Sequence, residues 1–157
     1  RGVAASGRAP DSGAERRVAG AQLSGSVDFP AALEWALSKL ARRDRFSGWI
    51  SEELSGAGCD QQVIDQVVTH LTRKGILDDD RVARITLEGK ADSDSHLAEL
   101  LRSKGAPEQS IQNWIDELPS ELDRARGRNK NISQLARLGF RQETLEALYP
   151  DRDFEMT

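Results

Sequence analysis

The sequence predicts an all-α fold in which tandem three-helix repeats form an elongated, curved array. The first indication is the spacing of the apolar residues, which follows the period of an amphipathic helix and not the two-residue alternation of a half-buried strand. The second is the punctuation of the chain by glycine, proline and capping residues at short intervals. The third is a helix–glycine–helix pattern that occurs three times, as expected of a repeat protein.

The clearest helix is predicted over residues 60–74. Its apolar stripe consists of Val63, Ile64, Val67, Val68 and Leu71. Asp60 stands at the capping position, where its carboxylate can accept a bond from the first turn, and Gly75 is the permissive residue that ends the helix. A first helix is predicted from Pro30 to about residue 42. The others are predicted at 47–57, 79–91, 94–104, 107–118, 120–128, 131–138 and 141–149.

The repeats are aligned on three glycines. Gly58, Gly105 and Gly139 lie 47 residues (58 to 105) and 34 residues (105 to 139) apart, and each is preceded by a leucine four positions earlier. The predicted organisation is a disordered tail at 1–27, repeats at 28–76, 77–118 and 119–150, and a C-terminal tail at 151–157. The third repeat is short or degenerate, because Glu121 falls where the other repeats have leucine. Units this small bury little surface alone, so neighbours are expected to stabilise one another.

Composition excludes several classes of protein. The 157 residues carry a net charge of −4 (22 basic, 26 acidic), which argues against wholesale wrapping of nucleic acid. No apolar run approaches the ~20 residues of a membrane helix, and the sequence has no secretory apolar core. The lone Cys59 cannot form an internal disulfide, which favours a reducing compartment. We therefore expect a cytoplasmic protein without membrane contact. A monomer is expected because a repeat array of this kind usually needs no self-association.

We predict no catalytic residue, no cofactor and no metal site. The sequence contains no phosphate-binding loop, nucleophile elbow or dinucleotide fingerprint. His70 and His96 lie in different predicted helices without ligand spacing, and the acidic run 78–80 lacks the alternating ligands and closing glutamate of a calcium loop. That run is better explained as the N-terminus of a helix, where the macrodipole favours negative charge. The protein is therefore not expected to be an enzyme.

Two basic clusters are the candidate partner-binding sites. The first is Arg42, Arg43 and Arg45, and the second is the run Arg124, Arg126, Arg128 and Lys130. Such clusters are explained either as solvated helix faces or as contacts with phosphate or with an acidic partner, for which the planar arginine fork is well suited. The tryptophans are predicted to be packing anchors.

Three fragments resemble the RecX family of RecA regulators, over about residues 30–150. ALSKLARRDRFSGWISEELSGAGCDQQVIDQVVTHLTRKGILDDDRVA resembles the first RecX repeat running into the second. RSKGAPEQSIQNWI resembles the turn of the second repeat, and RARGRNKNISQLARLGFRQETLEALY resembles the third. The resemblance implies a cytoplasmic protein of DNA repair, recombination and the SOS response. It would bind the RecA–DNA filament and limit its growth, ATPase or strand exchange, without chemistry of its own.

One departure from the family keeps open the alternative of a helical-repeat interaction protein with a different partner. RecX proteins are usually arginine-rich at the end of the fourth helix, whereas LEGKADSDSHLAEL here is acidic over residues 88–94 and is expected to repel phosphate. A second alternative is a helical DNA-binding module with weak contact to DNA, because three-helix units with a glycine turn resemble helix-turn-helix elements; the acidity of the chain disfavours it.

Overall fold

The computed structural model describes residues 27–151, and all the regular secondary structure in that range is α-helical. The predicted all-α fold is therefore confirmed. In chain order the helices are α2 (Phe29–Leu40), α3 (Ser47–Gly56), α4 (Gln61–Arg73), α5 (Asp79–Leu87), α6 (Asp94–Ser103), α7 (Glu108–Asp116), α8 (Glu121–Arg126), α9 (Ile132–Arg137) and α10 (Gln142–Leu148). The predicted tails lie outside the described residues, apart from Val27 and Asp151. Val27 is buried in the first hydrophobic core.

The predicted helix ends agree with the structure to within two residues, with one exception. We predicted that the fourth helix, which is α5 in the structure, would continue to residue 91, but α5 ends at Leu87. Gly89 follows with a φ of +72°, and the amide of Lys90 donates to the carbonyl of Leu87 at 3.0 Å. The prediction was wrong because this glycine adopts the left-handed conformation that ends helices and does not continue the helical path.

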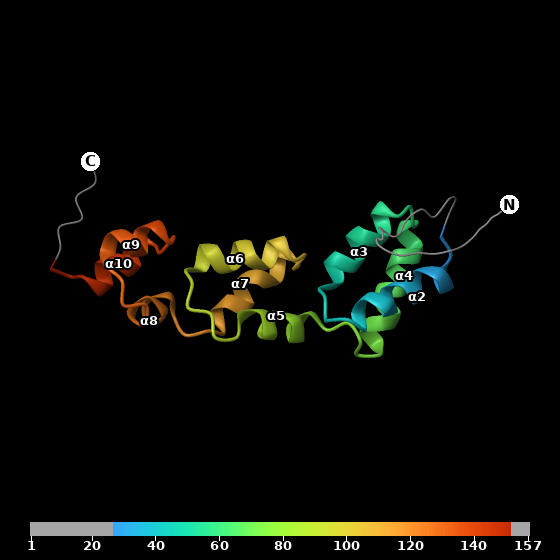
Figure 1. Ribbon diagram of the computed structural model, residues 1–157, viewed down its shortest axis with the longest axis horizontal. Coiled ribbons are helices and arrows are strands. Elements are labelled where there is room, and N and C mark those ends of the chain that lie inside the picture. Colours follow the sequence, from blue (N-terminus) through green and yellow to red (C-terminus); the bar gives the residue numbers. More distant parts are fainter. Residues whose placement is uncertain (1–26, 152–157) are drawn as a thin grey trace. The chain divides into compact units, whose positions relative to one another are not determined.

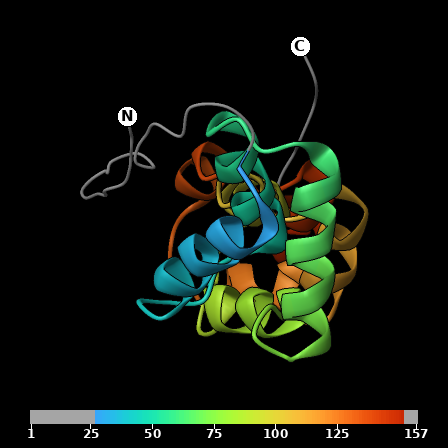
Figure 2. The same ribbon diagram turned by 90° about the vertical axis from the view of Figure 1, so that its right-hand side faces the viewer.

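The chain divides into two compact units, Arg1–Asp79 and Asp80–Thr157. In the first unit, α4 packs against both α2 and α3 (Figure 1). Figure 2 turns this unit toward the viewer, with α2 in blue and α4 in green. Their shared core includes Ala36, Ile50, Leu54, Ile64 and Leu71, so the predicted apolar stripe of α4 faces inward.

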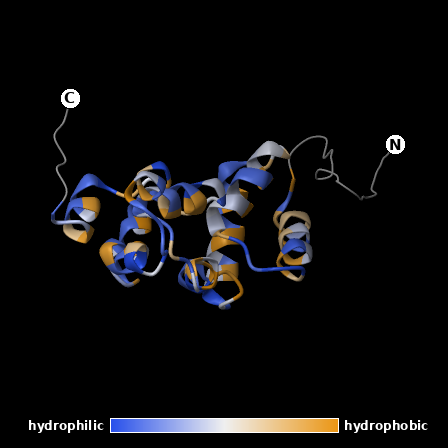
Figure 3. Ribbon diagram, turned by 60° about the vertical axis from the view of Figure 1, so that its left-hand side comes forward, coloured by the Kyte–Doolittle hydropathy of each residue, from blue (hydrophilic) through white to orange (hydrophobic). Residues whose placement is uncertain are grey.

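In the second unit, α6 packs on α7, and α10 packs on α8 and α9. The last three helices enclose a small core of Ala125, Leu135, Phe140 and Leu145. Trp114, a predicted packing anchor, is buried on α7, and its indole nitrogen donates to the carboxylate of Asp80 at 2.7 Å. Colouring by hydropathy shows hydrophobic and hydrophilic residues on the same helices, as expected of amphipathic elements (Figure 3). None of the described helices is long and apolar enough to cross a membrane.

The three aligned glycines form the same turn. Gly58, Gly105 and Gly139 have φ values of +94°, +91° and +91°. In each turn the residue after the glycine donates its amide to the leucine carbonyl five positions back. The three bonds are Cys59 to Leu54 at 3.0 Å, Ala106 to Leu101 at 3.0 Å and Phe140 to Leu135 at 3.2 Å. This is the 6→1 bond of a Schellman motif, and all three leucines are buried. The repeat boundaries and the curved array stay predictions.

The starts of α3 and α6 are capped by carboxylates from later helices. Asp79, the first residue of α5, accepts the amide and the hydroxyl of Ser47, both at 2.7 Å. Glu121, the first residue of α8, accepts the amide of Asp94 at 2.8 Å. By contrast, Asp60 occupies the N-cap of α4 but its side chain makes no capping bond, so the bond predicted from it is absent. The free amides of a helix start are thus satisfied here by residues remote in sequence.

Candidate partner-binding surfaces

The basic run on α8 begins with a buried arginine. The side chain of Arg124 is 3% exposed and forms an ion pair with Asp94 at the start of α6. Its guanidinium also donates to the carbonyl of Asp92 at 2.8 Å and to the carbonyl of Pro119 at 2.5 Å. A guanidinium that is 3% exposed and held by three acceptors inside the second unit is not presented to a partner. Its contribution is therefore to packing.

The next two arginines of the run are also paired. Arg128 lies 3.2 Å from the carboxylate of Asp92 and is half-buried. Arg126 is exposed and lies 3.3 Å from Asp123, one turn earlier on its own helix. Lys130 has an exposed side chain, and its carbonyl accepts the hydroxyl of Tyr149 at 2.9 Å. The basic run and part of the acidic stretch 88–94 thus meet, and much of their charge is neutralised within the second unit.

A buried glutamate organises this contact. The side chain of Glu121 is 1% exposed and accepts four hydrogen bonds. They come from the amide of Asp94 (2.8 Å), the amide and Nε of Arg141 (2.9 and 3.3 Å) and the hydroxyl of Thr144 (2.7 Å). Sequence reasoning treated Glu121 as a sign of a degenerate repeat. Its only sequence signal is the presence of a charged residue at an otherwise apolar repeat position.

Two opposing effects set the pKa of Glu121. Burial by itself raises the pKa of this carboxyl, because a low-dielectric site disfavours the ionised form. The hydrogen bonds from Thr144, from the amides of Arg141 and Asp94, and from the Arg141 side chain favour the ionised form, and their sum lowers the pKa below its ordinary value. The carboxylate is therefore charged at neutral pH and stabilises the start of both α6 and α10.

The other basic cluster, in the first unit, is arranged differently. The guanidinium carbon of Arg45 lies 4.1 Å from the centre of the Trp49 ring, and Lys39 Nζ lies 5.7 Å from the centre of the Trp35 ring. The two indoles stack on each other, 6.0 Å apart and 15° from parallel. Both tryptophans also pack against the first core, which agrees with their predicted role as anchors. Two cations are thus placed by aromatic rings and not by carboxylates.

The loop after α2 adds two more charges. Arg42 and Arg43 are exposed, and neither forms an ion pair with any residue in the range 27–151. Burial lowers the pKa of Arg45, the positive charge of Arg43 lowers it further, and Glu53 partly offsets both effects. Arg45 stays protonated, as arginines do in proteins. The cluster therefore keeps a concentrated positive charge.

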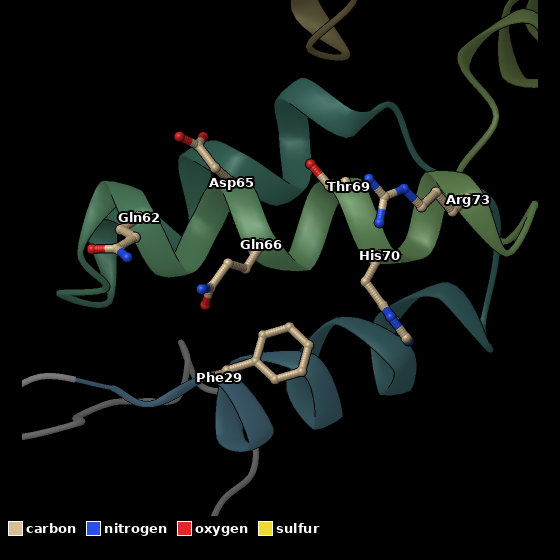
Figure 4. Close-up of a pocket in the computed structure, with 7 residues that line it drawn as sticks. All are labelled: Phe29, Gln62, Asp65, Gln66, Thr69, His70 and Arg73. Carbon is tan, nitrogen blue, oxygen red and sulfur yellow. The ribbon is translucent and has the colours of Figure 1, made fainter.

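A groove is lined by one residue of α2 and six residues of α4. It measures about 970 Å³ and is lined by Phe29, Gln62, Asp65, Gln66, Thr69, His70 and Arg73. In Figure 4 the imidazole of His70 projects from α4 toward α2, which carries Phe29. The two rings meet edge to face, 5.9 Å between centres. Within the described part of the chain, no three His, Cys, Asp or Glu side chains are grouped so as to hold a metal ion.

Solved structures resemble this arrangement of helices. One, described as the crystal structure of regulatory protein RecX, matches with a TM-score of 0.59 and 17% identity, covering 78% of this chain and 72% of that one. Another, RecX from Lactobacillus salivarius, matches with a TM-score of 0.64 and 12% identity, covering 79% and 96%. The chain has the RecX fold. No protein-family model and no curated protein matches the sequence.

The RecX fold separates the predicted site residues into two groups. Arg42, Arg43 and Arg45 lie together on the first unit and keep their charge. In the second group, Arg124 is buried, and Arg126 and Arg128 are paired with carboxylates. Lys130 is the member of this run that has no carboxylate partner among the described residues. Sequence spacing could not separate the groups, because the neutralising acids Asp92 and Asp94 lie some thirty positions from their partners. Whether any of these residues contacts a partner stays a prediction.

Proposed function

We propose that this protein is a RecX-like regulator that binds a RecA-type recombinase filament and restrains its activity in recombination and DNA repair. The observation that carries the proposal is the match to two RecX structures over more than three-quarters of the chain, at TM-scores of 0.59 and 0.64. The quoted sequence fragments support it independently, because they follow the order and spacing of the RecX repeats.

The arrangement of the described residues suits a binding role. Glu121 and Arg124, the buried charged side chains of the second unit, are engaged in bonds that hold helices together. Cys59 is buried, and burial together with the neighbouring Asp60 raises the pKa of its thiol, which disfavours the reactive thiolate. In this proposal the protein acts as a cytoplasmic monomer, by contact alone and without a cofactor.

The acidic stretch that departs from the family does not argue against this role as strongly as its composition suggests. Asp92 and Asp94 are paired with Arg128 and Arg124, so their charge is largely neutralised inside the second unit. Glu88 is exposed. The acidic surface that would repel phosphate is thus smaller than the composition of residues 88–94 implied.

The test is the ATPase of a RecA-type recombinase on single-stranded DNA. The protein is added to preformed filaments and, separately, before filament assembly. We expect hydrolysis to fall with increasing protein in both orders, and more strongly when the protein is present during assembly. Unchanged hydrolysis at several-fold excess over the recombinase, in both orders, would refute the proposal. A pull-down that recovers another protein and no recombinase would favour the alternative of a different partner.

A further inference from the structure

The first unit carries a surface that we name the cation–indole surface. It consists of Trp35, Lys39, Arg42, Arg43, Arg45 and Trp49. The stretch 39–45 contains four cations and one acid, Asp44, for a local charge of +3 (4 − 1). Because exposed charges are screened beyond about 8 Å at physiological salt, this local excess matters more to an approaching ligand than the net charge of the whole chain.

The positive charge of this surface is neutralised only in part, by Asp44 within the stretch and by Glu53 near Arg45. Arg42 and Arg43 have no ion pair among the described residues, and the rings under Lys39 and Arg45 carry no net charge. The Nε of Arg45 is moreover buried without a hydrogen-bond partner in the described structure. Trp35 and Trp49 pack on the first core, but buried donors are normally satisfied and clustered like charges oppose folding, so stability alone does not explain the clustering of the cations.

The second basic cluster provides the contrast within the same protein. There Arg124, Arg126 and Arg128 each have a carboxylate partner. Two clusters of similar composition thus differ in what holds their cations: carboxylates in one, indole rings in the other. Only the ring-held cluster offers both charge and aromatic surface to a ligand.

We propose that the cation–indole surface binds single-stranded nucleic acid. Phosphates would be held by Arg42, Arg43 and Arg45, and a base would stack on the indole of Trp35. Lys39 lies 5.7 Å from that ring, close to the limit of about 6 Å for a cation–π contact, so a base can displace it. Cationic grooves with aromatic platforms are typical of proteins that bind single strands. An acidic protein segment would use the cations but not the rings, and a duplex would hide its bases.

This inference does not rest on the proposed function, and it is tested without a recombinase. The full chain is titrated into a fluorescein-labelled oligothymidylate, and anisotropy is followed from about 20 mM salt upward. With three cations contacting phosphates, the slope of log affinity against log salt is expected to be about −2.1. The exposed double variant R42A/R43A should lose about tenfold in affinity at low salt, and its slope should fall to about −0.7.

Two further variants separate charge from stacking. The matched control R84A/K104A removes two charges from exposed positions outside both basic clusters and should bind within about twofold of the parent. Trp35→Leu should lose about tenfold in affinity with the salt slope unchanged, because stacking releases no counterion. Circular dichroism checks that each variant keeps its helices.

The proposal is overturned if the parent does not bind at the lowest salt. It is also overturned if R84A/K104A loses as much affinity as R42A/R43A, since the charge effect would then be nonspecific. Polyglutamate is the competitor that tests for an acidic protein partner. If it displaces the oligothymidylate as well as unlabelled oligothymidylate does, at equal charge, the surface is a general anion site and the assignment to nucleic acid is wrong.

Discussion

Replacing Glu121 by glutamine should destabilise the unit Asp80–Thr157 without changing its shape. Glutamine has the same length as glutamate, but one carboxylate oxygen becomes an amide nitrogen that donates. In the native structure, one oxygen of Glu121 accepts from Asp94 and the other accepts from Arg141 and Thr144. Whichever way the amide is turned, a donor then faces a donor.

The magnitude follows from these contacts. A hydrogen bond to a charged group contributes about 1.5–3 kcal/mol, and a buried donor left without an acceptor costs a similar amount. Glutamine loses at least one such bond and the charge that supports the others. We therefore expect the free energy of unfolding to fall by about 2–3 kcal/mol for Glu121→Gln. For Glu121→Ala, which leaves every donor unsatisfied, we expect a fall of about 3–5 kcal/mol.

The effect should depend on pH in a defined direction. The folded pKa of Glu121 lies below the ordinary value of 4.5, so in the folded state the carboxyl holds its proton less tightly. A group of this kind contributes its full stability above the unfolded pKa and loses it as the pH falls through the folded pKa. The difference in the free energy of unfolding between the parent and Glu121→Gln should therefore be constant near neutral pH and become smaller below about pH 4.5.

Urea unfolding followed by far-ultraviolet circular dichroism measures both quantities. Glu117→Gln is the matched control, because it makes the same chemical change at an exposed position and should shift the free energy by no more than about 0.5 kcal/mol. If Glu121→Gln proved as stable as this control at pH 7, the buried carboxylate would not hold α6, α8 and α10 together. If the difference in the free energy of unfolding between the parent and Glu121→Gln increased on acidification, the pKa of Glu121 would not be lowered in the folded state.

Two other substitutions test the remaining features of the second unit. Gly139→Ala should cost about 1–3 kcal/mol, because φ is +91° and the added Cβ would lie 2.8 Å from the hydroxyl of Ser95. Gly56→Ala, at a helical position with open space around it, should be neutral or stabilising by up to about 1 kcal/mol, and chemical unfolding of both variants makes the comparison. Arg124→Gln should cost about 3–5 kcal/mol, because it removes the buried cation of Asp94 and leaves only the exposed Arg141, 3.7 Å away, whereas the exposed Arg126→Gln should cost less than about 1 kcal/mol. Equal losses for the two arginines would contradict the buried role of Arg124.

The sequence alone determined the helices and the recurring turn between them. Both are local: apolar spacing decides which face of α4 is buried, and glycine is needed wherever φ is positive, as at Gly58, Gly105 and Gly139. The one error in helix length, at α5, came from overlooking the same signal at Gly89. The resemblance to RecX proteins likewise rested on the order of such local signals.

Only the tertiary structure decided which charged side chains are buried or paired and which are exposed. Whether an arginine is a free cation depends on which acid lies beside it, and that acid can be remote in the chain, as Asp94 is from Arg124. The same holds for Glu121. Its charge occupies an otherwise apolar repeat position, and only the folded structure shows that Asp94, Arg141 and Thr144 donate hydrogen bonds to it. Electrostatic interactions depend on the distance between charges and on their burial, and the spacing of residues along the sequence reports neither quantity.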